Sequence, residues 1–266
     1  MKIGFIGTGN MGGALARAAA KGGHTLLLAN RTPAKAAALA KELGGTVCPN
    51  AQAAETAELL FLGVKPQGLP GLAGELAPVL QARQGNAPVV ISMATAVTLR
   101  ELDAMLGGGL PLIRIMPNTP AAVGAGTILY AAQNVTDAQL NAFRAVLAQA
   151  GLLLPLPEEK IDAASAISGC GPAFCFQFAD ALALGGVRAG LSYPDACRLA
   201  AQTMLGAAEM LLQGGEAPDV LKMRVCSPAG TTIEGVLALE QGGFSYTVQN
   251  AVTAAYRRTV EMTKKG

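Results

Sequence analysis

Residues 2–14 read Lys-Ile-Gly-Phe-Ile-Gly-Thr-Gly-Asn-Met-Gly-Gly-Ala, an apolar run followed by closely spaced glycines. The run over Ile3–Ile6 predicts a buried β-strand, and the small apolar residues over Met11–Lys21 predict a helix. Between them lies a G-x-G-x-x-G turn. This order of strand, glycine-rich turn and helix is typical of the start of a nucleotide-binding α/β unit.

Each glycine of the turn has its own physical role. Gly7 allows the tight turn, Gly9 lets the backbone approach a pyrophosphate, and Gly12 permits close packing of helix and strand. The helix start adds free N–H groups and a favourable dipole for phosphate. A purely structural turn is the alternative, but the context favours a dinucleotide site. The predicted contacts are Ile6, Gly7, Thr8, Gly9, Asn10, Met11 and Gly12.

Short apolar runs and helical patterns alternate through the first half of the chain. The runs are continuously apolar, as in strands of a parallel sheet that helices cover on both faces. We therefore expect an α/β fold with a Rossmann-type, mainly parallel sheet. The expected strands are Lys2–Gly7, Thr25–Ala29, Leu59–Val64, Val89–Met93, Leu112–Met116, Thr127–Ala131 and Leu152–Leu154, with helices that include Met11–Lys21, Pro33–Leu43 and Asp137–Ala150.

The pattern changes after Pro155-Leu156-Pro157, beyond which long helical stretches follow with few strand signals. We expect a dinucleotide-binding Rossmann domain over residues 1–155 and an all-helical domain over residues 156–266. The helical part is more apolar than one small domain can bury, so it predicts a dimer interface. Its expected helices are Ile161–Ala189, Pro194–Gln213, Pro218–Lys222, Thr231–Gly242 and Tyr246–Lys264.

The composition excludes several classes of protein. With 266 residues, and about 150 residues per domain, one large or two modest domains are expected. A formal net charge of +2 argues against nucleic acid as a general partner. No uninterrupted apolar run reaches the roughly 18 residues of a membrane span, and the N-terminus is typical of a strand rather than a signal peptide. We expect a cytoplasmic protein without membrane contact.

Cysteine and histidine usage limits the chemistry. Five cysteines without a C-x-x-C pair argue against a disulfide framework or a metal site and favour a reducing compartment. The one histidine, His24, precedes a predicted strand. Histidine-rich metal sites are thereby excluded, and so is a Ser-His-Asp triad unless His24 serves in it. Catalysis must therefore run almost without imidazole.

The end of the second predicted strand indicates which dinucleotide binds. An NAD site usually has an acidic residue there for the ribose 2′-hydroxyl, but this sequence reads Ala29-Asn30-Arg31-Thr32. Asn30 and Thr32 can donate hydrogen bonds, and the Arg31 guanidinium suits a 2′-phosphate. A solvated loop arginine is the alternative. These residues predict NADPH as the preferred cofactor, with NADH as a second one.

Other segments that follow strands supply further cofactor candidates. In Val64-Lys65-Pro66, the lysine either contacts ribose or phosphate or is an ordinary surface residue. Asn50 is either a helix N-cap or a cofactor contact. After the last main strand, Met116-Pro117-Asn118 begins a loop that two prolines stiffen over the place expected for the nicotinamide.

Two loops of small residues in the second half are candidate substrate contacts. Ser168-Gly169-Cys170-Gly171-Pro172-Ala173 interrupts a helical pattern, and its N–H groups can receive a carboxylate. A helix break at tight packing is the alternative. Ser227-Pro228-Ala229-Gly230-Thr231-Thr232 places two hydroxyls at a helix start, where simple N-capping by Ser227 or Thr231 is the alternative.

Five of these segments, in this order along nearly the whole chain, resemble the pyrroline-5-carboxylate reductase family. Two positions depart from the family pattern: Cys170 replaces its usual serine, and Ala229 replaces its first glycine. Both changes are small for small, so they should weaken backbone-mediated binding little, and no role is given to a side chain at 170. The five segments are Gly7–Gly12, Val64–Pro66, Met116–Pro120, Asp162–Phe174 and Ser227–Ile233.

The resemblance implies an enzyme of proline biosynthesis that uses NAD(P)H to reduce the C=N bond of 1-pyrroline-5-carboxylate to L-proline. It also implies a helical domain that interlocks two subunits, in a homodimer or a larger ring of dimers. The substrate carboxylate would meet Ser168–Ala173 and the amides near Gly230 and Thr231, and the Thr232 hydroxyl would hydrogen-bond the ring nitrogen. Glu158 matches a position near the substrate in some members.

The scarcity of proton-donating side chains in the second half of the chain is consistent with this reaction. A ketone reductase needs a Lys, His or Tyr to protonate a developing alkoxide, but no lysine lies between Lys160 and Lys222 and no histidine follows His24. An imine can arrive protonated, so catalysis reduces to positioning and electrostatics. Two rivals remain: another Rossmann reductase of imines or hydroxyacids, and a non-catalytic NADP(H)-binding redox sensor. The sensor would need neither Thr231-Thr232 nor the Ser168–Ala173 loop.

Overall fold

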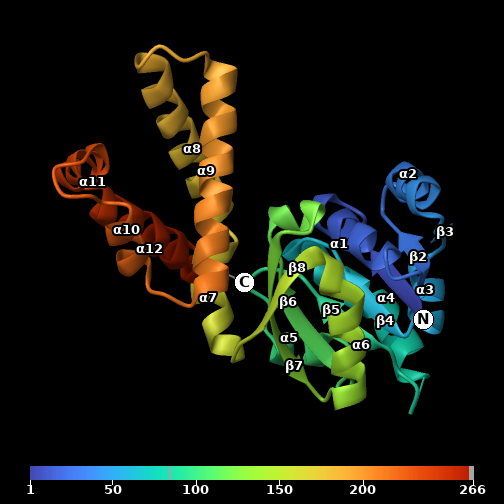
Figure 1. The fold of residues 1–266 in the computed structure, drawn as a ribbon. Helices are drawn as coiled ribbons and strands as arrows, with labels where there is room; N and C mark the ends of the chain where they lie inside the picture. The colour runs from blue at the N-terminus through green and yellow to red at the C-terminus, as the bar shows by residue number, and fades with distance from the viewer. Residues whose placement is uncertain (84, 264–266) are drawn as a thin grey trace. The chain divides into compact units, whose positions relative to one another are not determined.

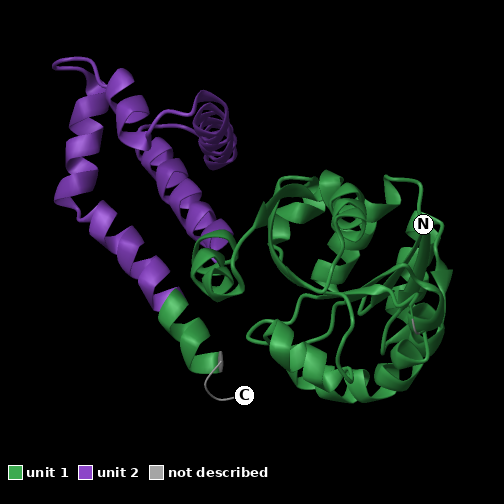
Figure 2. Cartoon of the chain, turned by 90° about the horizontal axis from the view of Figure 1, so that it is seen from below, with its two compact units in different colours: residues 1–169, 256–266 green, residues 170–255 purple. Residues whose placement is uncertain are grey.

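A computed structural model describes residues 1–83 and 85–263. The chain divides into two compact units (Figure 2). The first comprises Met1–Gly169 together with the last turns of the C-terminal helix from Tyr256 onward, and the second comprises Cys170–Ala255.

The first unit is built on an eight-stranded sheet in the order β3-β2-β1-β4-β5-β6-β7-β8 (Figure 1). Neighbouring strands pair in parallel except β6 and β7, which are antiparallel. The strand order reverses at β1, as in dinucleotide-binding sheets, so the predicted Rossmann-type, mainly parallel sheet is confirmed. The strands are β1 (Lys2–Ile6), β2 (Thr25–Ala29), β3 (Thr46–Val47), β4 (Leu59–Leu62), β5 (Val89–Ser92), β6 (Leu112–Met116), β7 (Gly126–Gln133) and β8 (Gly151–Pro155).

Helices cover both faces of this sheet. Successive side chains of β4 point to opposite faces. Leu59 and Phe61 share one core with α1, α2 and α6, whereas Leu60 and Leu62 share the other with α3, α4, α5 and α7. A sheet buried on both faces requires the continuously apolar strands seen in the sequence. The helices are α1 (Asn10–Ala20), α2 (Pro33–Leu43), α3 (Asn50–Thr56), α4 (Leu69–Gln81), α5 (Leu99–Met105), α6 (Asp137–Leu147) and α7 (Glu158–Ser168).

Three features of the first unit differ from what the sequence pattern predicts. Strand β3 has only two residues, both exposed, and leaves no periodic signal. The helix expected over Asp137–Ala150 ends as α6 at Leu147 and continues as a 3₁₀ turn, Ala148–Ala150. Strand β7 runs antiparallel to β6, because the connection 117–125 is shorter than the crossover of about a dozen residues that a parallel pair needs.

The second unit, residues 170–255, consists of helices joined by turns and contains no strand, as predicted. Its fully buried hydrophobic side chains are small ones, Ala183, Ala196 and Ala200, whereas Phe176 is 70% exposed and Leu212 is 80% exposed. This unit therefore leaves much apolar surface uncovered within one chain. The helices are α8 (Gly171–Arg188), α9 (Tyr193–Gly214), α10 (Pro218–Arg224), α11 (Thr231–Gln241) and α12 (Phe244–Thr263); Lys264, the predicted end of the last helix, lies outside the described residues.

The helix expected over Ile161–Ala189 is interrupted between α7 and α8. α7 packs within the first unit, so the division between the units falls after Gly169, whereas the sequence places the domain boundary after residue 155. One stretch of the described chain, Glu158–Arg188, is long and apolar enough, by length and composition alone, to cross a membrane. Only 6% of the residues in its most apolar part are buried. A helix at a subunit interface has the same composition.

Candidate active site

The glycine-rich loop follows β1 at the edge of the sheet where the parallel strands end. Gly7 has a φ of +98°, and a Cβ atom there would lie 2.5 Å from the carbonyl oxygen of Gly63. A Cβ atom on Gly12 would collide with the carbonyl oxygen of Gly7. At Gly9, by contrast, no described heavy atom lies within 4 Å of where a Cβ would be. The loop therefore combines a packed turn with the open backbone that a pyrophosphate site needs.

Two backbone hydrogen bonds hold this loop between its neighbouring strands. The Gly7 N–H donates to the Ala29 carbonyl at 2.8 Å, and the Gly63 N–H donates to the Ile6 carbonyl at 2.7 Å. α1 then begins at Asn10, and the first N–H groups of a helix have no partner inside it. The loop and the helix start together form a site suited to an anion.

Asn30 connects this loop to the end of β2. Its Oδ1 accepts a hydrogen bond from the Thr8 N–H at 3.0 Å, and its Nδ2 donates to the Thr32 carbonyl at 3.0 Å. Thr8 is 7% exposed, and its buried hydroxyl has no partner within the described chain. Buried polar groups are normally satisfied, so this hydroxyl fits a loop that receives a polar ligand.

Arg31 and Thr32 follow directly and are exposed to solvent. Within residues 1–83 and 85–263 the Arg31 guanidinium forms no salt bridge. It is therefore available to a ligand phosphate at the end of β2.

We expect Arg31→Ala to narrow the preference for NADPH over NADH by about tenfold, because one charge-assisted hydrogen-bonding group is lost. The ratio of kcat/KM for the two dinucleotides, measured at a fixed substrate concentration, gives the preference. Lys41→Ala, a change of an exposed lysine in the last turn of α2, is the matched control and should leave the ratio unchanged. The same ratio in Arg31→Ala as in the wild type would contradict the phosphate assignment.

The remaining candidates near this edge differ in their surroundings. Asn50 is the first residue of α3, whose N-cap is the preceding proline, so the N-cap interpretation of Asn50 is wrong. Its Nδ2 donates to Glu75 Oε2 at 3.1 Å. Val64 and Pro66 are half-buried after β4, and Lys65 between them is exposed. The Lys65 ammonium is thus free to reach a ligand at the same edge as the glycine-rich loop.

The loop after β6 is buried. Met116 is 8% exposed and Asn118 is 7% exposed, with Pro117 buried between them. Asn118 Oδ1 accepts from the Thr127 N–H at 2.8 Å, and its Nδ2 donates to the Ser168 carbonyl at 2.8 Å. Asn118 thereby joins β7 and the last residue of α7 to this loop, a structural contact that the sequence does not predict.

A second link between β6 and α7 is ionic. The side chain of Arg114, in β6, is 3% exposed and pairs with Glu158 at 3.3 Å and with Asp162 at 2.5 Å. Glu158 Oε1 also accepts from the Leu99 N–H, at the start of α5, at 2.7 Å. The carboxylate that the family resemblance puts near the substrate is therefore held inside the first unit by Arg114 and Leu99.

Sequence reasoning missed this ionic cluster, although a signal for it was present. Arg114 interrupts a strand that is otherwise apolar, and a buried charge needs a partner because its desolvation is costly. The expected helix begins only at Ile161 and leaves Glu158 out, whereas in the structure α7 carries Glu158 and Asp162 four residues apart on one face. The sequence therefore indicates that Arg114 has an acidic partner, but it does not identify which carboxylates pair with it.

The predicted loop Ser168–Ala173 lies at the break between α7 and α8. Its first two residues belong to the first unit and the other four to the second. Pro172, in the first turn of α8, has no N–H to lose there, and the Ala173 N–H donates to the Cys170 carbonyl at 3.0 Å. Within the described chain the buried Ser168 hydroxyl has no partner. The helix break is thus observed, and the carboxylate-binding role stays a prediction.

The predicted pair of hydroxyls lies at the start of α11 in the second unit. Thr231 and Thr232 are its first two residues, both exposed, and Gly230 is its N-cap without a side-chain capping bond. N-capping by Ser227 or Thr231 is therefore wrong. The two hydroxyls are open to a ligand at this helix start.

Ala229 precedes this helix in an unusual backbone conformation. Its φ is +55°, in the left-handed region, which costs a residue with a Cβ about 1–2 kcal/mol. Glycine, the residue of the family pattern at this position, adopts it freely. The exchange is therefore small in volume but adds backbone strain next to Gly230.

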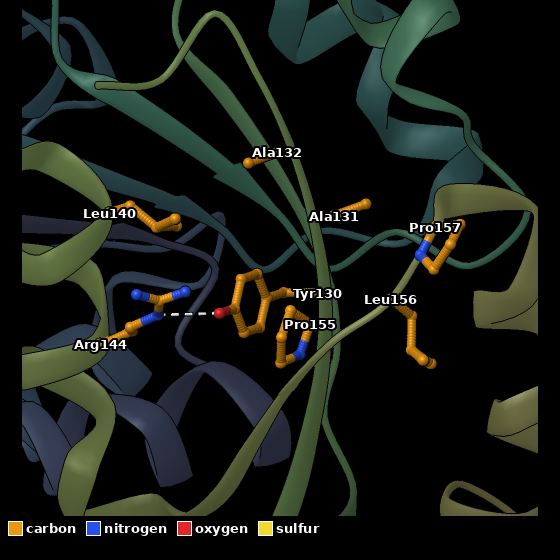
Figure 3. Close-up of a pocket in the computed structure, with 8 residues that line it drawn as sticks. All are labelled: Tyr130, Ala131, Ala132, Leu140, Arg144, Pro155, Leu156 and Pro157. Carbon is orange, nitrogen blue, oxygen red and sulfur yellow. Dashed lines mark hydrogen bonds between the residues drawn. The ribbon is translucent and has the colours of Figure 1, made fainter. Parts of the chain in front are cut away.

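His24 and a pocket beside the sheet lie apart from these residues. His24 precedes β2, at the edge opposite the glycine-rich loop. A pocket of about 350 Å³ lies beside β7, β8 and α6 (Figure 3), where the Tyr130 hydroxyl accepts from Arg144 Nε at 2.8 Å. None of the predicted site residues lines this pocket. Its lining residues are Tyr130, Ala131, Ala132, Leu140, Arg144, Pro155, Leu156 and Pro157.

A mainly parallel sheet whose order reverses at β1, an open glycine-rich loop and an acid-free end of β2 define a dinucleotide-binding protein of the Rossmann type. The sequence model of the family described as NADP oxidoreductase, coenzyme F420-dependent, matches residues 2–96. The model of the pyrroline-5-carboxylate reductase dimerisation family matches residues 158–262.

Individual relatives extend this match over the whole chain. Pyrroline-5-carboxylate reductase of Synechocystis sp. is 42% identical over 220 residues, which are 81% of this chain and 79% of that one. The solved structure of the Coxiella burnetii enzyme has 32% identity and a TM-score of 0.89, covering 97% of each chain. The Plasmodium falciparum pyrroline carboxylate reductase with NADP bound has 30% identity and a TM-score of 0.86, covering 99% of each. The chain belongs to the pyrroline-5-carboxylate reductase family.

Proposed function

We propose that this protein reduces the C=N bond of 1-pyrroline-5-carboxylate with NADPH, giving L-proline in the last step of proline biosynthesis. The observation that carries the proposal is the presence, in one chain of this family, of an open glycine-rich loop and of the exposed Thr232 hydroxyl at the start of α11. The solved relative with NADP bound supports NADPH as the cofactor.

The first unit has residues that fit the dinucleotide, which supplies a hydride when bound. The backbone of Gly7–Gly12 and the first N–H groups of α1 bind the pyrophosphate. Arg31 and Thr32 bind the 2′-phosphate, and Asn30 holds the two segments together. NADH binds more weakly, because Arg31 then has no phosphate to contact. Further proposed contacts are Asn50, Val64, Lys65, Pro66, Met116 and Pro117.

The substrate is held through its carboxylate and its ring nitrogen. The N–H groups of the Ser168–Ala173 loop, and those near Gly230 and Thr231, bind the carboxylate, since successive backbone N–H groups favour an anion. The Thr232 hydroxyl hydrogen-bonds the ring nitrogen and so orients the imine carbon. Glu158 acts indirectly, because its carboxylate is already held by Arg114 and the Leu99 N–H.

No ionisable side chain has to deliver a proton in this reaction. The ring nitrogen is protonated before reduction, so addition of hydride to the iminium carbon leaves a neutral amine. The work of the protein is then to position the iminium and exclude water. The one imidazole, that of His24, lies at the far edge of the sheet and takes no part.

Two other functions have less support. A hydroxyacid reductase needs a proton donor for the alkoxide, and the sequence has no lysine between Lys160 and Lys222. A redox sensor needs the nucleotide loop but no exposed hydroxyl at Thr232. Reduction of a different cyclic imine uses the same chemistry, so only a comparison of substrates separates it from the proposed reaction.

The second unit supports assembly into a homodimer or a ring of dimers. Its large exposed apolar side chains need covering, and residues 158–262 match the dimerisation family. Such an interface also accounts for the apolar composition of Glu158–Arg188 without a membrane. We place the protein in the cytoplasm, where its five unpaired cysteines stay reduced. Its net charge of +2 provides no basis for binding nucleic acid.

Initial rates with NADPH and three substrates distinguish these functions. We expect kcat/KM to be highest for 1-pyrroline-5-carboxylate, lower for its six-membered cyclic analogue, and undetectable for a 2-oxo acid. A preference for the six-membered imine would assign another imine as substrate. NADPH binding without oxidation in any of the three reactions would favour the redox sensor.

A further inference from the structure

α7 is attached to the end of β6 at two points, one near each end of the helix. At its first turns, Glu158 and Asp162 pair with Arg114 of β6. At its last residue, the Ser168 carbonyl accepts a hydrogen bond from Asn118, two residues beyond β6. Both anchors therefore come from one short stretch of backbone. These contacts fix the position of the end of α7 relative to the sheet edge where the nucleotide loop lies.

The Asn118 amide links its own loop to β7 and to the end of α7. Its Oδ1 accepts from the Thr127 N–H and its Nδ2 donates to the Ser168 carbonyl, each at 2.8 Å. Only one orientation of the amide serves both a backbone donor and a backbone acceptor. The residue is 7% exposed, so water competes little for either bond.

The bond from Asn118 satisfies a carbonyl at the C-terminal end of α7. The last four carbonyls of an α-helix have no partner inside the helix, and the Ser168 carbonyl obtains one from Asn118. Ser168 is also the first residue of the proposed carboxylate loop, and Gly169 follows it out of the helix. A misplacement of about 1 Å at a binding segment can cost about 100-fold in activity, so an anchor at this point controls the start of the loop.

We propose that Asn118 is a positioning residue for the substrate: by holding the last turn of α7, it sets where the Ser168–Ala173 loop begins, and it acts without touching the dinucleotide. The inference rests on the proposed function of that loop. It differs from the interpretation of Asn118 as a cofactor contact, because it assigns the role of the side chain to its bonds with Thr127 and Ser168.

Asn118→Asp isolates the bond to Ser168, because a carboxylate still accepts from the Thr127 N–H but cannot donate to a carbonyl. At saturating NADPH, we expect the KM for 1-pyrroline-5-carboxylate to rise by at least about tenfold while kcat falls by less than about threefold. The Kd for NADPH, measured by fluorescence, should remain within about twofold of the wild type because the nucleotide loop is unchanged.

Asn30→Asp is the matched control, since Asn30 forms the same kind of bridge at the nucleotide loop. The introduced carboxylate still accepts from the Thr8 N–H but loses the donation to Thr32 and repels the 2′-phosphate. It should raise the Kd for NADPH by at least about fivefold and leave the KM for the imine within about twofold. Asn118→Asp thus weakens binding of the imine, whereas Asn30→Asp weakens binding of NADPH.

Three results would overturn the inference. An increased Kd for NADPH in Asn118→Asp with an unchanged imine KM would make Asn118 a dinucleotide contact. Failure of both Asn118→Asp and Asn118→Ala to fold would make it a general stability residue. A wild-type protein that binds NADPH but does not reduce the imine would remove the proposed function itself, and the inference with it, before any variant is compared.

Discussion

Replacing Thr232 by alanine is expected to lower kcat with 1-pyrroline-5-carboxylate by about 10- to 100-fold, roughly the contribution of one or two hydrogen bonds. The Thr232 hydroxyl is exposed in the first turn of α11, where the ring nitrogen is its proposed partner. Without it, the imine loses the bond that orients its carbon for hydride transfer. Thr232→Ser retains a hydroxyl and should recover most of the activity in steady-state kinetics.

The binding of NADPH separates this role from a structural one. Thr232→Ala should leave the Kd for NADPH unchanged, because the proposed dinucleotide contacts all lie in the first unit. Thr253→Ala is the matched control, since its hydroxyl donates to the Gln249 carbonyl within α12 at 2.9 Å, and it should retain wild-type kcat. A collapse of NADPH affinity in Thr232→Ala, or equal losses of kcat in both variants, would contradict the assignment.

Replacing Arg114 by methionine is expected to produce the largest loss of stability. The change removes the cation that pairs with Glu158 and Asp162, whose side chains are 27% and 22% exposed. Breaking a buried ion pair costs about 3–5 kcal/mol, and partial exposure of the two carboxylates favours the lower end. At about 2–4 °C per kcal/mol, the Tm should fall by roughly 6–12 °C in a thermal melt.

An exposed ion pair supplies the control for this experiment. Arg17 pairs with Glu42 at 2.6 Å, but their side chains are 44% and 48% exposed, so water screens the pair. Arg17→Met should therefore change the Tm by less than about 2 °C. Equal shifts in Arg17→Met and Arg114→Met would show that Arg114 contributes no more than a surface charge.

The sheet of the first unit could be predicted from the sequence because its strands are apolar on both faces. Leu59–Leu62 supplies side chains to two cores, and such runs are recognisable without knowing their neighbours. The direction of β7 is not encoded in its own residues. It depends on the length of the 117–125 connection, which excludes a crossover. The short strand β3 has too few residues to show any period.

The site was predictable where its geometry is local. The Gly7–Gly12 turn spans six residues of chain: backbone conformation and close contacts dictate glycine at Gly7, a close contact dictates it at Gly12, and the space around Gly9 is open. The bonds of Asn118 to Ser168 and of Arg114 to Asp162 join residues far apart in sequence, and no periodic pattern reports such contacts. Only the charge of Arg114 within an apolar strand indicated that a partner existed.

The helical unit shows a different limit. The apolar spacing predicted its helices, but not how their apolar faces are covered, because that depends on a second chain. The backbone strain at Ala229 was also hidden. Its side chain differs from glycine by one methyl group, whereas its φ of +55° is visible only in the folded chain.

The most direct test of the account is the stoichiometry of one reaction. The protein is incubated with limiting NADPH and excess 1-pyrroline-5-carboxylate, with the loss of NADPH absorbance and the proline formed measured in the same sample. The account predicts one L-proline for each NADPH oxidised, and no oxidation when a 2-oxo acid replaces the imine. NADPH that stays reduced in the presence of the imine, or that is oxidised without forming proline, would contradict it.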